Sequence, residues 1–248
     1  MRKLYVGLLA IVFGLSVVPR ADAALILAGD IQGLLFCASD NNIGCSNGTV
    51  LTDTDPALGV LALGVTSIAG VTVNGSVHTV VVGPPTNLLD STSLSIINTN
   101  PTPITARLSV SATDFVGPVS EASATASGTW GNGSQGSSVL LTWWNDNTNQ
   151  QGAETTFDRP GLLVDTFSDT ANAQIDSFSH NGGPFAVSDT GAFSMTLGLD
   201  MTLLGNDSLI SRGQSEIKDV AAVAEPTTML LLGAGLLGGG AKLRKRKV

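Results

Sequence analysis

The chain has 248 residues, of which 43% are hydrophobic and 5% aromatic, and its formal net charge is −8. Between residues 24 and 224 the imbalance is stronger, because four basic residues stand against 18 acidic ones and give a net charge of −14. Nothing in this stretch neutralises a run of phosphates, which excludes nucleic acid and anionic lipid as its partners.

The first 23 residues are predicted to be a secretory signal peptide. Two basic residues at positions 2 and 3 precede an apolar run over 4–18, and Ala21 and Ala23 then form an Ala-x-Ala site. This combination predicts export, with cleavage by signal peptidase between residues 23 and 24. An uncleaved membrane anchor is the alternative, but the apolar run is shorter than the roughly 20 residues that a bilayer helix needs.

Two cysteines, Cys37 and Cys45, lie near the start of the exported part. Export places them in an oxidising compartment, which favours a small loop closed by a disulfide. A metal pair and reactive thiols are the alternatives, and both lack a neighbouring His or activating cation in the sequence.

The exported part is predicted to be all-β, because its hydrophobic pattern has period two. Over 104–115 and 193–203 apolar residues alternate with polar ones, which places one row inward and one toward water. Short strands separated by turn-forming residues indicate a single antiparallel β-sandwich over residues 24–222, jelly-roll or immunoglobulin-like, flanked by apolar helices in the N-terminal signal and the C-terminal tail. Further strands are predicted over 94–98, 122–130, 139–144, 162–167 and 174–179.

Local sequence features predict the connections between these strands. Asn74-Gly75 stands between two β-branched runs and predicts a two-residue hairpin turn. The segment before Gly70 is predicted to be a loop-rich entry, with a helical turn near Pro56–Leu63. The string "GNGSQG" over 131–136 is predicted to be a hairpin loop.

No catalytic residue, cofactor or metal ligand is predicted. The string over 131–136 has the letters of a dinucleotide-binding fingerprint, but a strand pattern follows it, so no helix N-terminus receives a pyrophosphate. His78 and His180 lack the spacing of a zinc motif. The loop strings over 53–56 and 145–149 carry oxygen ligands of the kind that calcium takes, but turn formation explains both equally well, so calcium binding is left open.

Trp143 and Trp144 are predicted to be candidate glycan contacts. Adjacent residues of a strand point to opposite faces, so the two rings cannot both enter the core. One ring is expected to meet solvent, a neighbouring loop or a ligand. An exposed ring beside the amide and carboxylate groups of 145–147 has the chemistry of a sugar-binding surface. Coverage of the outward ring by the protein itself is the alternative.

Residues 223–248 are predicted to be a sorting tail that inserts into the membrane transiently. The apolar run over 229–241 spans roughly 20 Å as a helix, against a hydrocarbon core of about 30 Å, and glycines weaken it further. The basic end that follows, with Arg244, Lys245 and Arg246, is expected to stay cytoplasmic and to halt export.

The order of Glu225-Pro226, the glycine-rich apolar run and the basic end resembles the PEP-CTERM sorting tail of Gram-negative bacteria. Ala224 stands where that family has the first proline of its Pro-Glu-Pro signature. The resemblance covers only residues 224–248. It implies processing by an exosortase, a membrane protease-transpeptidase, and delivery to the cell envelope or extracellular matrix. A simple tail anchor is the alternative.

These features favour an exported, non-enzymatic protein that is structural or associated with exopolysaccharide, since sorting systems of this kind often accompany exopolysaccharide production. The competing hypothesis is a secreted hydrolase on the same β-sandwich. A glycoside hydrolase needs two carboxylates that converge across a cleft, and the sequence places no two of its acidic residues in this way.

Overall fold

The computed structural model describes residues 24–40, 45, 47–81, 86–131 and 135–219. Within these ranges the chain forms 13 β-strands and no α-helix, which confirms the predicted all-β class. The strands are β1 (Leu25–Ile31), β2 (Leu34–Ser39), β3 (Thr49–Val50), β4 (Val60–Ile68), β5 (Val71–Val81), β6 (Thr86–Asn98), β7 (Ile104–Val116), β8 (Val119–Gly131), β9 (Ser138–Asp146), β10 (Leu162–Thr170), β11 (Asp176–Asp189), β12 (Ala192–Leu203) and β13 (Ser208–Lys218).

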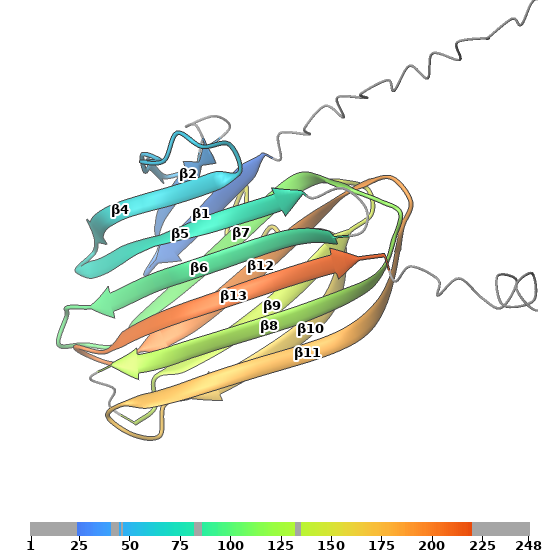
Figure 1. The fold of residues 1–248 in the computed structure, drawn as a ribbon. Coiled ribbons are helices and arrows are strands. Elements are labelled where there is room, and N and C mark those ends of the chain that lie inside the picture. Colours follow the sequence, from blue (N-terminus) through green and yellow to red (C-terminus); the bar gives the residue numbers. More distant parts are fainter. Residues whose placement is uncertain (1–23, 41–44, 46, 82–85, 132–134, 220–248) are drawn as a thin grey trace, which may run out of the picture.

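The strands form two sheets that pack face to face (Figure 1). One sheet has seven strands in the order β10-β9-β12-β7-β1-β2-β3, and the other has six in the order β11-β8-β13-β6-β5-β4. The short contact between β2 and β3 is parallel, and the other pairings of the described strands are antiparallel. The edge strands β10 and β11 therefore lie at the same side of the sandwich.

Strands β6 to β13 determine the connectivity of the sandwich. Successive strands alternate between the sheets from β6 to β9 and again from β10 to β13, while β9 and β10 are neighbours in one sheet. The resulting halves, β6-β13-β8-β11 and β7-β12-β9-β10, have the strand order of a jelly roll. The N-terminal strands extend both sheets at the opposite side, where β1 pairs with β7 and β5 pairs with β6.

The core lies between the sheets and consists of the inward rows of the strands, as the period-two pattern predicts. Strand β8 contributes a row of small residues that ends in Gly128. A Cβ atom on Gly128 would lie 2.3 Å from the ring of Phe178, so the missing side chain makes room for that ring. The inward row of β12 is completely buried: Phe193, Met195, Leu197, Leu199, Met201 and Leu203.

The prediction of a loop-rich entry before Gly70 is wrong, because β1, β2, β3 and β4 precede that residue. Strand β1 is buried on both faces. Leu25 and Leu27 pack in the core between the sheets, and Ile26 and Ala28 pack in a second cluster on the outer face. The sequence of a strand that is covered on both faces is a continuous apolar run, so it lacks the alternation of period two that predicts a strand.

The predicted hairpin turn at Asn74-Gly75 is also wrong, because both residues lie in the middle of β5. Asn74 pairs with Ser95, and a Cβ atom on Gly75 would lie 2.2 Å from the backbone oxygen of Ser93. The glycine therefore permits a close approach of two strands. The actual turn between β4 and β5 is Ala69-Gly70, just before β5 begins, and both of its residues have positive φ.

The remaining predicted connections have mixed outcomes. The segment that includes 131–136 joins β8 of one sheet to β9 of the other, so it is no hairpin loop. The predicted helical turn near Pro56–Leu63 is wrong: Val60 N donates to Ala57 O in a single non-helical turn, and β4 begins at Val60. The predicted apolar helices fall in 1–23 and in the tail, which lie outside the described residues. Among the residues that are described, no helix is long and apolar enough to cross a membrane.

Cys37 of β2 and Cys45 form the predicted disulfide, with their Cα atoms 6.0 Å apart. Cys37 is buried, and its backbone oxygen accepts a hydrogen bond from Leu51 N at 2.7 Å. The disulfide thus ties the loop after β2 to a strand whose position is already fixed by the core.

Candidate functional site

Trp143 and Trp144 lie on opposite faces of β9, as their adjacency predicts. Trp143 faces the core, is 1% exposed and donates a hydrogen bond from Nε1 to the backbone oxygen of Gln214 at 3.0 Å. It offers no ring face to a sugar. Trp144 lies half-buried on the outer face of the seven-stranded sheet, between Leu163 of β10 and Thr196 of β12. Of the two predicted glycan contacts, only Trp144 keeps an outward position.

Residues 147–161 join β9 to β10 and form a strap over the outer face of the seven-stranded sheet. Connections of this length without strands or helices are uncommon in compact domains and are often functional. The methyl group of Ala153 is buried against Ile26 and Ala28 of β1. Serine hydroxyls of the sheet hold the strap backbone: Ser194 Oγ donates to Gln150 O at 2.7 Å, Ser109 Oγ donates to Thr156 O at 3.0 Å, and Ser111 Oγ accepts from Gly152 N at 3.1 Å.

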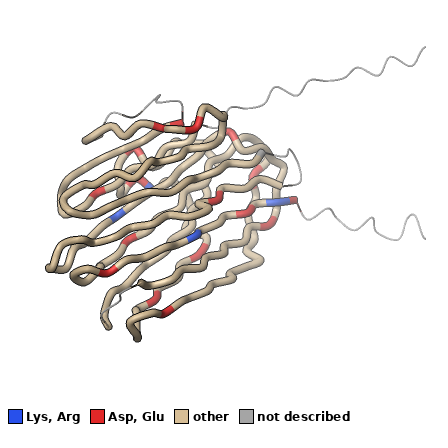
Figure 2. The backbone as a smooth tube through the Cα atoms, turned by 60° about the vertical axis from the view of Figure 1, so that its left-hand side comes forward, with Lys and Arg blue, Asp and Glu red and all other residues tan. Residues whose placement is uncertain are grey.

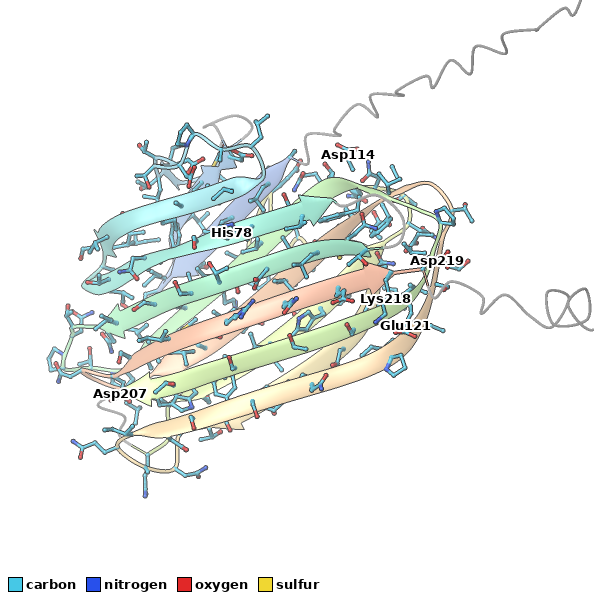
Figure 3. The ribbon with its side chains drawn as sticks, in the orientation of Figure 1. His78, Asp114, Glu121, Asp207, Lys218 and Asp219 are labelled. Atoms are coloured by element: carbon cyan, nitrogen blue, oxygen red, sulfur yellow. A yellow bond between two sulfur atoms is a disulfide. The ribbon has the colours of Figure 1, made fainter. Side chains whose placement is uncertain are left out.

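The start of the strap is fixed at one end of the sandwich. Asn149 Nδ2 donates to Asp114 Oδ1 at 2.7 Å, and Asp114 N donates back to Asn149 Oδ1 at 2.8 Å. Both residues have positive φ, which Asn and Asp tolerate better than most residues. Asp114 lies at the end of the sandwich opposite Asp207 (Figure 3).

Arg159 fixes the other half of the strap through an ion pair with Asp200 of β12. Its Nη2 lies 2.7 Å from Asp200 Oδ1, and its Nη1 lies 3.2 Å from Asp200 Oδ2. The Nε and Nη1 atoms also donate to the hydroxyls of Ser109 and Thr142. The guanidinium lies over Gly198, where a Cβ atom would approach Arg159 Cζ to 2.4 Å. The absence of a side chain at Gly198 therefore lets the guanidinium lie against the sheet.

A groove of about 380 Å³ lies beside this ion pair and crosses β7, β12, β9 and β10. Most of its outward side chains carry hydroxyl groups, which donate and accept hydrogen bonds. Two charged residues and one leucine complete the lining. The outward residues are Thr105, Arg107, Ser138, Leu140, Ser168, Thr170, Asp200 and Thr202.

An exposed aromatic ring stands at the edge of this groove. Phe157 of the strap is 67% exposed, and the Cζ atom of Arg107 lies 4.7 Å from its ring centroid. The cation–π contact holds this largely exposed ring in place. Phe157 does not line the groove, but it contacts Arg107, which does, so an apolar ring stands next to the row of hydroxyl groups.

A second cavity, of about 500 Å³, lies where β9 and β11 end. Asn145 Nδ2 donates to Asp189 Oδ2 at 2.7 Å, which links the two sheets. Burial raises the pKa of Asp189, the hydrogen bond from Asn145 opposes this effect, and repulsion from Asp146 adds to it. Burial also acts to raise the pKa of Asp146, but hydrogen bonds from Thr148 and from Gln150 N outweigh it, so that the pKa is lowered.

Polar contacts also seal the side of the sandwich at β10 and β11. His180 Nε2 lies 2.7 Å from Asp165 Oδ2, and the imidazole stacks on Phe167 at 4.7 Å between ring centroids. Asp169 borders the groove, but its carboxylate turns inward and accepts a hydrogen bond from Trp130 Nε1 at 2.8 Å. The contact of His180 with Asp165 joins the edge strands β10 and β11, and the contact of Asp169 with Trp130 joins β10 to β8.

The described residues contain no group of three or more His, Cys, Asp or Glu side chains that could hold a metal ion. His78 lies on β5 with Ser76 Oγ at 3.3 Å, far from His180 in the sheet order. In the first predicted calcium string, Asp53 Oδ1 accepts hydrogen bonds from Asp55 N and Ala62 N, which is turn formation. The second string begins at Asn145 and borders the cavity between β9 and β11.

No sequence pattern predicts a role in a site for Arg107, Phe157, Arg159, Asp200 or Asp189. The one indication in the sequence is that basic residues are scarce. Arg107 and Arg159 are two of only four in residues 24–224, so each is a candidate for a specific contact. Figure 2 shows how few basic residues there are among the acidic ones along the described backbone. The ion pair and the groove depend on contacts between strands far apart in sequence, which no local pattern contains.

Comparison with protein-family models matches residues 222–247 to the PEP-CTERM protein-sorting motif. The predicted sorting tail is thus confirmed. The motif implies that the protein is exported and processed by an exosortase, a membrane protease, in the cell envelope of a Gram-negative bacterium. The predicted sorting residues Glu225, Pro226, Arg244, Lys245 and Arg246, and the signal-cleavage residues Ala21 and Ala23, lie outside the described residues.

Comparison with curated proteins gives no match. Several solved structures are similar to this chain at low scores, among them the following three. TmCBM61 in complex with β-1,4-galactotriose has a TM-score of 0.30 and 10% identity, over 51% of this chain and 71% of that one. The C-terminal CBM6 of LamC, a marine laminarinase from Zobellia galactanivorans, has a TM-score of 0.23 and 12% identity, over 64% and 99%. The CBM22-1 xylan-binding domain from Paenibacillus barcinonensis Xyn10C has a TM-score of 0.28 and 14% identity, over 66% and 89%. Likenesses of this size assign no ligand to the chain.

Proposed function

We propose that the exported body binds a polysaccharide in the groove on the outer face of the seven-stranded sheet. The observation that carries this proposal is the exposed ring of Phe157 beside a row of hydroxyl groups. A sugar ring presents an apolar face and a rim of hydroxyl groups, so it matches an aromatic ring flanked by donors and acceptors. Trp144 stays a candidate contact beside the strap.

The charges of the groove favour a neutral polysaccharide. Asp200 is already paired with Arg159, and Arg107 is engaged by the Phe157 ring. The body around the groove has a net charge of −14, which repels acidic sugars at long range.

We infer that binding is not followed by hydrolysis. A glycosidase needs one protonated and one ionised carboxyl group facing each other across the cleft. Both oxygens of Asp200 are paired with the guanidinium of Arg159, and the carboxylate of Asp169 turns away from the groove to Trp130. These contacts support a binding role over the competing hydrolase hypothesis.

The sorting motif supports the view that this binding takes place in the cell envelope or the extracellular matrix. Signal peptidase removes residues 1–23, and the tail inserts in the membrane until an exosortase cuts it. The exported body then associates with exopolysaccharide through the groove. A structural matrix protein and a simple tail-anchored surface protein are the other outcomes that the tests below distinguish.

The test is a glycan array followed by calorimetry with the purified full chain. We expect binding to neutral polysaccharides, and Phe157→Ala should weaken it about tenfold or more, which corresponds to about 1.4 kcal/mol. Phe157→Tyr keeps the ring and should retain affinity. Ile175→Ala is the matched control, because Ile175 is an exposed apolar residue that does not line the groove.

Two results would overturn the proposal. One is the absence of binding by the wild-type chain to every polysaccharide tested. The other is a Phe157→Ala variant that binds as tightly as the wild type. Release of shorter oligosaccharides from a bound polysaccharide would instead support the hydrolase hypothesis.

A further inference from the structure

The cavity between the ends of β9 and β11 contains two buried carboxylates without a basic partner. Asp189 is 3% exposed and Asp146 is 5% exposed, and both line the cavity. All four basic residues of the described chain are engaged elsewhere: Arg107 with Phe157, Arg159 with Asp200, Arg212 with Asp90, and Lys218 with Glu121 and Glu216. Buried carboxylates that lack a cationic partner are costly, because desolvation disfavours the charged form.

A second observation in the same cavity concerns the amide of Asn145. This side chain also lines the cavity and is 6% exposed. Its Nδ2 donates to Asp189 Oδ2, but its Oδ1 is buried and has no hydrogen-bond partner among the described residues. A buried amide oxygen without a donor costs free energy, and in a native protein a water or a bound ion satisfies such an atom.

We propose that this cavity binds a calcium ion, with the carboxylate of Asp189 and the amide oxygen of Asn145 as protein ligands. Asp146 supplies a second negative charge nearby. Its own oxygens are already used by Thr148 and by Gln150 N, so it acts through its field and by fixing the start of the strap. The cation satisfies the amide oxygen and neutralises the buried charge of Asp189.

The ligand chemistry favours calcium over other common cations. Carboxylate and amide oxygens are hard ligands, and calcium accepts them in irregular geometry with water completing its shell. Magnesium demands a near-ideal octahedron, and zinc prefers nitrogen and sulfur ligands, which no described residue of this cavity supplies. With one charged ligand, the affinity should fall in the range of extracellular modules, with a dissociation constant of roughly 0.1–1 mM.

The test is thermal unfolding of the purified full chain after treatment with EDTA, in increasing CaCl2. A saturating excess of about 100 times the dissociation constant should raise Tm by about 5–10 °C, and MgCl2 at the same ionic strength should raise it much less. Calorimetry should give one calcium ion per chain.

Two substitutions separate a ligand role from a structural one. Asp189→Asn should abolish the calcium-dependent rise in Tm while leaving Tm in EDTA unchanged or higher, because the amide needs no countercharge. Asn145→Asp should lower Tm in EDTA by adding a like charge, and calcium should restore it. Asp176→Asn, at the other end of β11, removes the same charge away from the cavity and should keep the full calcium response.

The proposal is overturned if the wild-type Tm does not respond to calcium, or if Asp189→Asn retains the response. An Asn145→Asp variant that is equally unstable with and without calcium also contradicts it, because a hydrogen bond alone would explain that result. None of these outcomes depends on polysaccharide binding, so the experiments test the calcium site independently of the proposed function.

Discussion

Arg159 and Asp200 form a bidentate ion pair that joins the strap to β12, with Nη2 and Oδ1 2.7 Å apart and Nη1 and Oδ2 3.2 Å apart. The side chain of Arg159 is 11% exposed, although it lies on the outer face of a sheet. The strap itself supplies the cover. The ion pair therefore belongs to a second, polar interface outside the main core, and the groove lies directly beside it.

Arg159→Ala should lower the free energy of unfolding by about 2 kcal/mol, because it leaves a carboxylate and two hydroxyl groups without their donor. Urea unfolding measures this change. Lys218→Ala is the control, because Lys218 pairs with Glu121 and Glu216 but its side chain is 37% exposed. Its loss should cost about 0–1 kcal/mol. Equal effects of the two substitutions would show that the strap does not shield the pair.

Gly198→Ala should destabilise the protein by about 1–3 kcal/mol, because the new methyl group overlaps Arg159 Cζ and Thr142 Oγ1. Limited proteolysis should then cut within the strap faster than in the wild type. Gly191→Ala serves as the control, since a Cβ atom there meets no atom within 4 Å, and it should stay within about 0.5 kcal/mol of the wild type. If Gly198→Ala has the stability and the proteolysis rate of the wild type, the guanidinium of Arg159 does not lie over Gly198.

Cys45→Ser should lower the free energy of unfolding by about 2–3 kcal/mol, because it opens a loop that the disulfide closes across a sequence separation of 8. Urea unfolding with and without a reductant measures the effect. The reductant should destabilise the wild type by a similar amount and leave the variant unchanged. A reductant effect on Cys45→Ser would point to a cause other than this bond.

Asp146 should contribute stability that depends on pH. Its pKa is lowered in the folded protein, so its contribution is present above the ordinary carboxyl value and is lost as the pH falls through the lowered folded value. In EDTA, Asp146→Asn should therefore be less stable than the wild type near neutral pH, and the difference should shrink in acid. Thr148→Val should show the same trend more weakly, because the bonds from the backbone remain. If the free energies of unfolding of the wild type and Asp146→Asn differ by the same amount at every pH, Asp146 makes no pH-dependent contribution to stability.

Mass spectrometry of the exported protein should show that everything after about Glu225 or Pro226 has been removed. Replacing Arg244, Lys245 and Arg246 with Gln should leave the tail attached, because the basic end that halts export is lost. The amino terminus should begin at Ala24 in both proteins. Recovery of the wild-type chain with its basic end intact would contradict processing.

The fold class was predictable because apolar and polar residues alternate along the strands. The rows of β7 and β12 illustrate this, since every second residue faces the core. Strand β1 was missed because the strap covers its outer face, which replaces alternation by a continuous apolar run. The predicted hairpin turn at Asn74-Gly75 failed because this glycine lets β6 approach β5 closely. That is a contact between strands, which local turn propensity does not describe.

The candidate site was predictable only in part. The adjacency of Trp143 and Trp144 correctly implied opposite faces, because that follows from backbone geometry alone. Which ring faces the core depends on the register of β9 against β10 and β12, and this is a tertiary property.

By itself, the sequence determined the all-β class, the disulfide and the sorting tail, because each is encoded by residues close together in the chain. Only the tertiary structure decided that Arg107 and Phe157 meet, that Arg159 reaches Asp200, and that Asn145 meets Asp189. These contacts join strands and loops distant in sequence. They depend on the jelly-roll pairing and the path of the strap, which arise when the whole core packs.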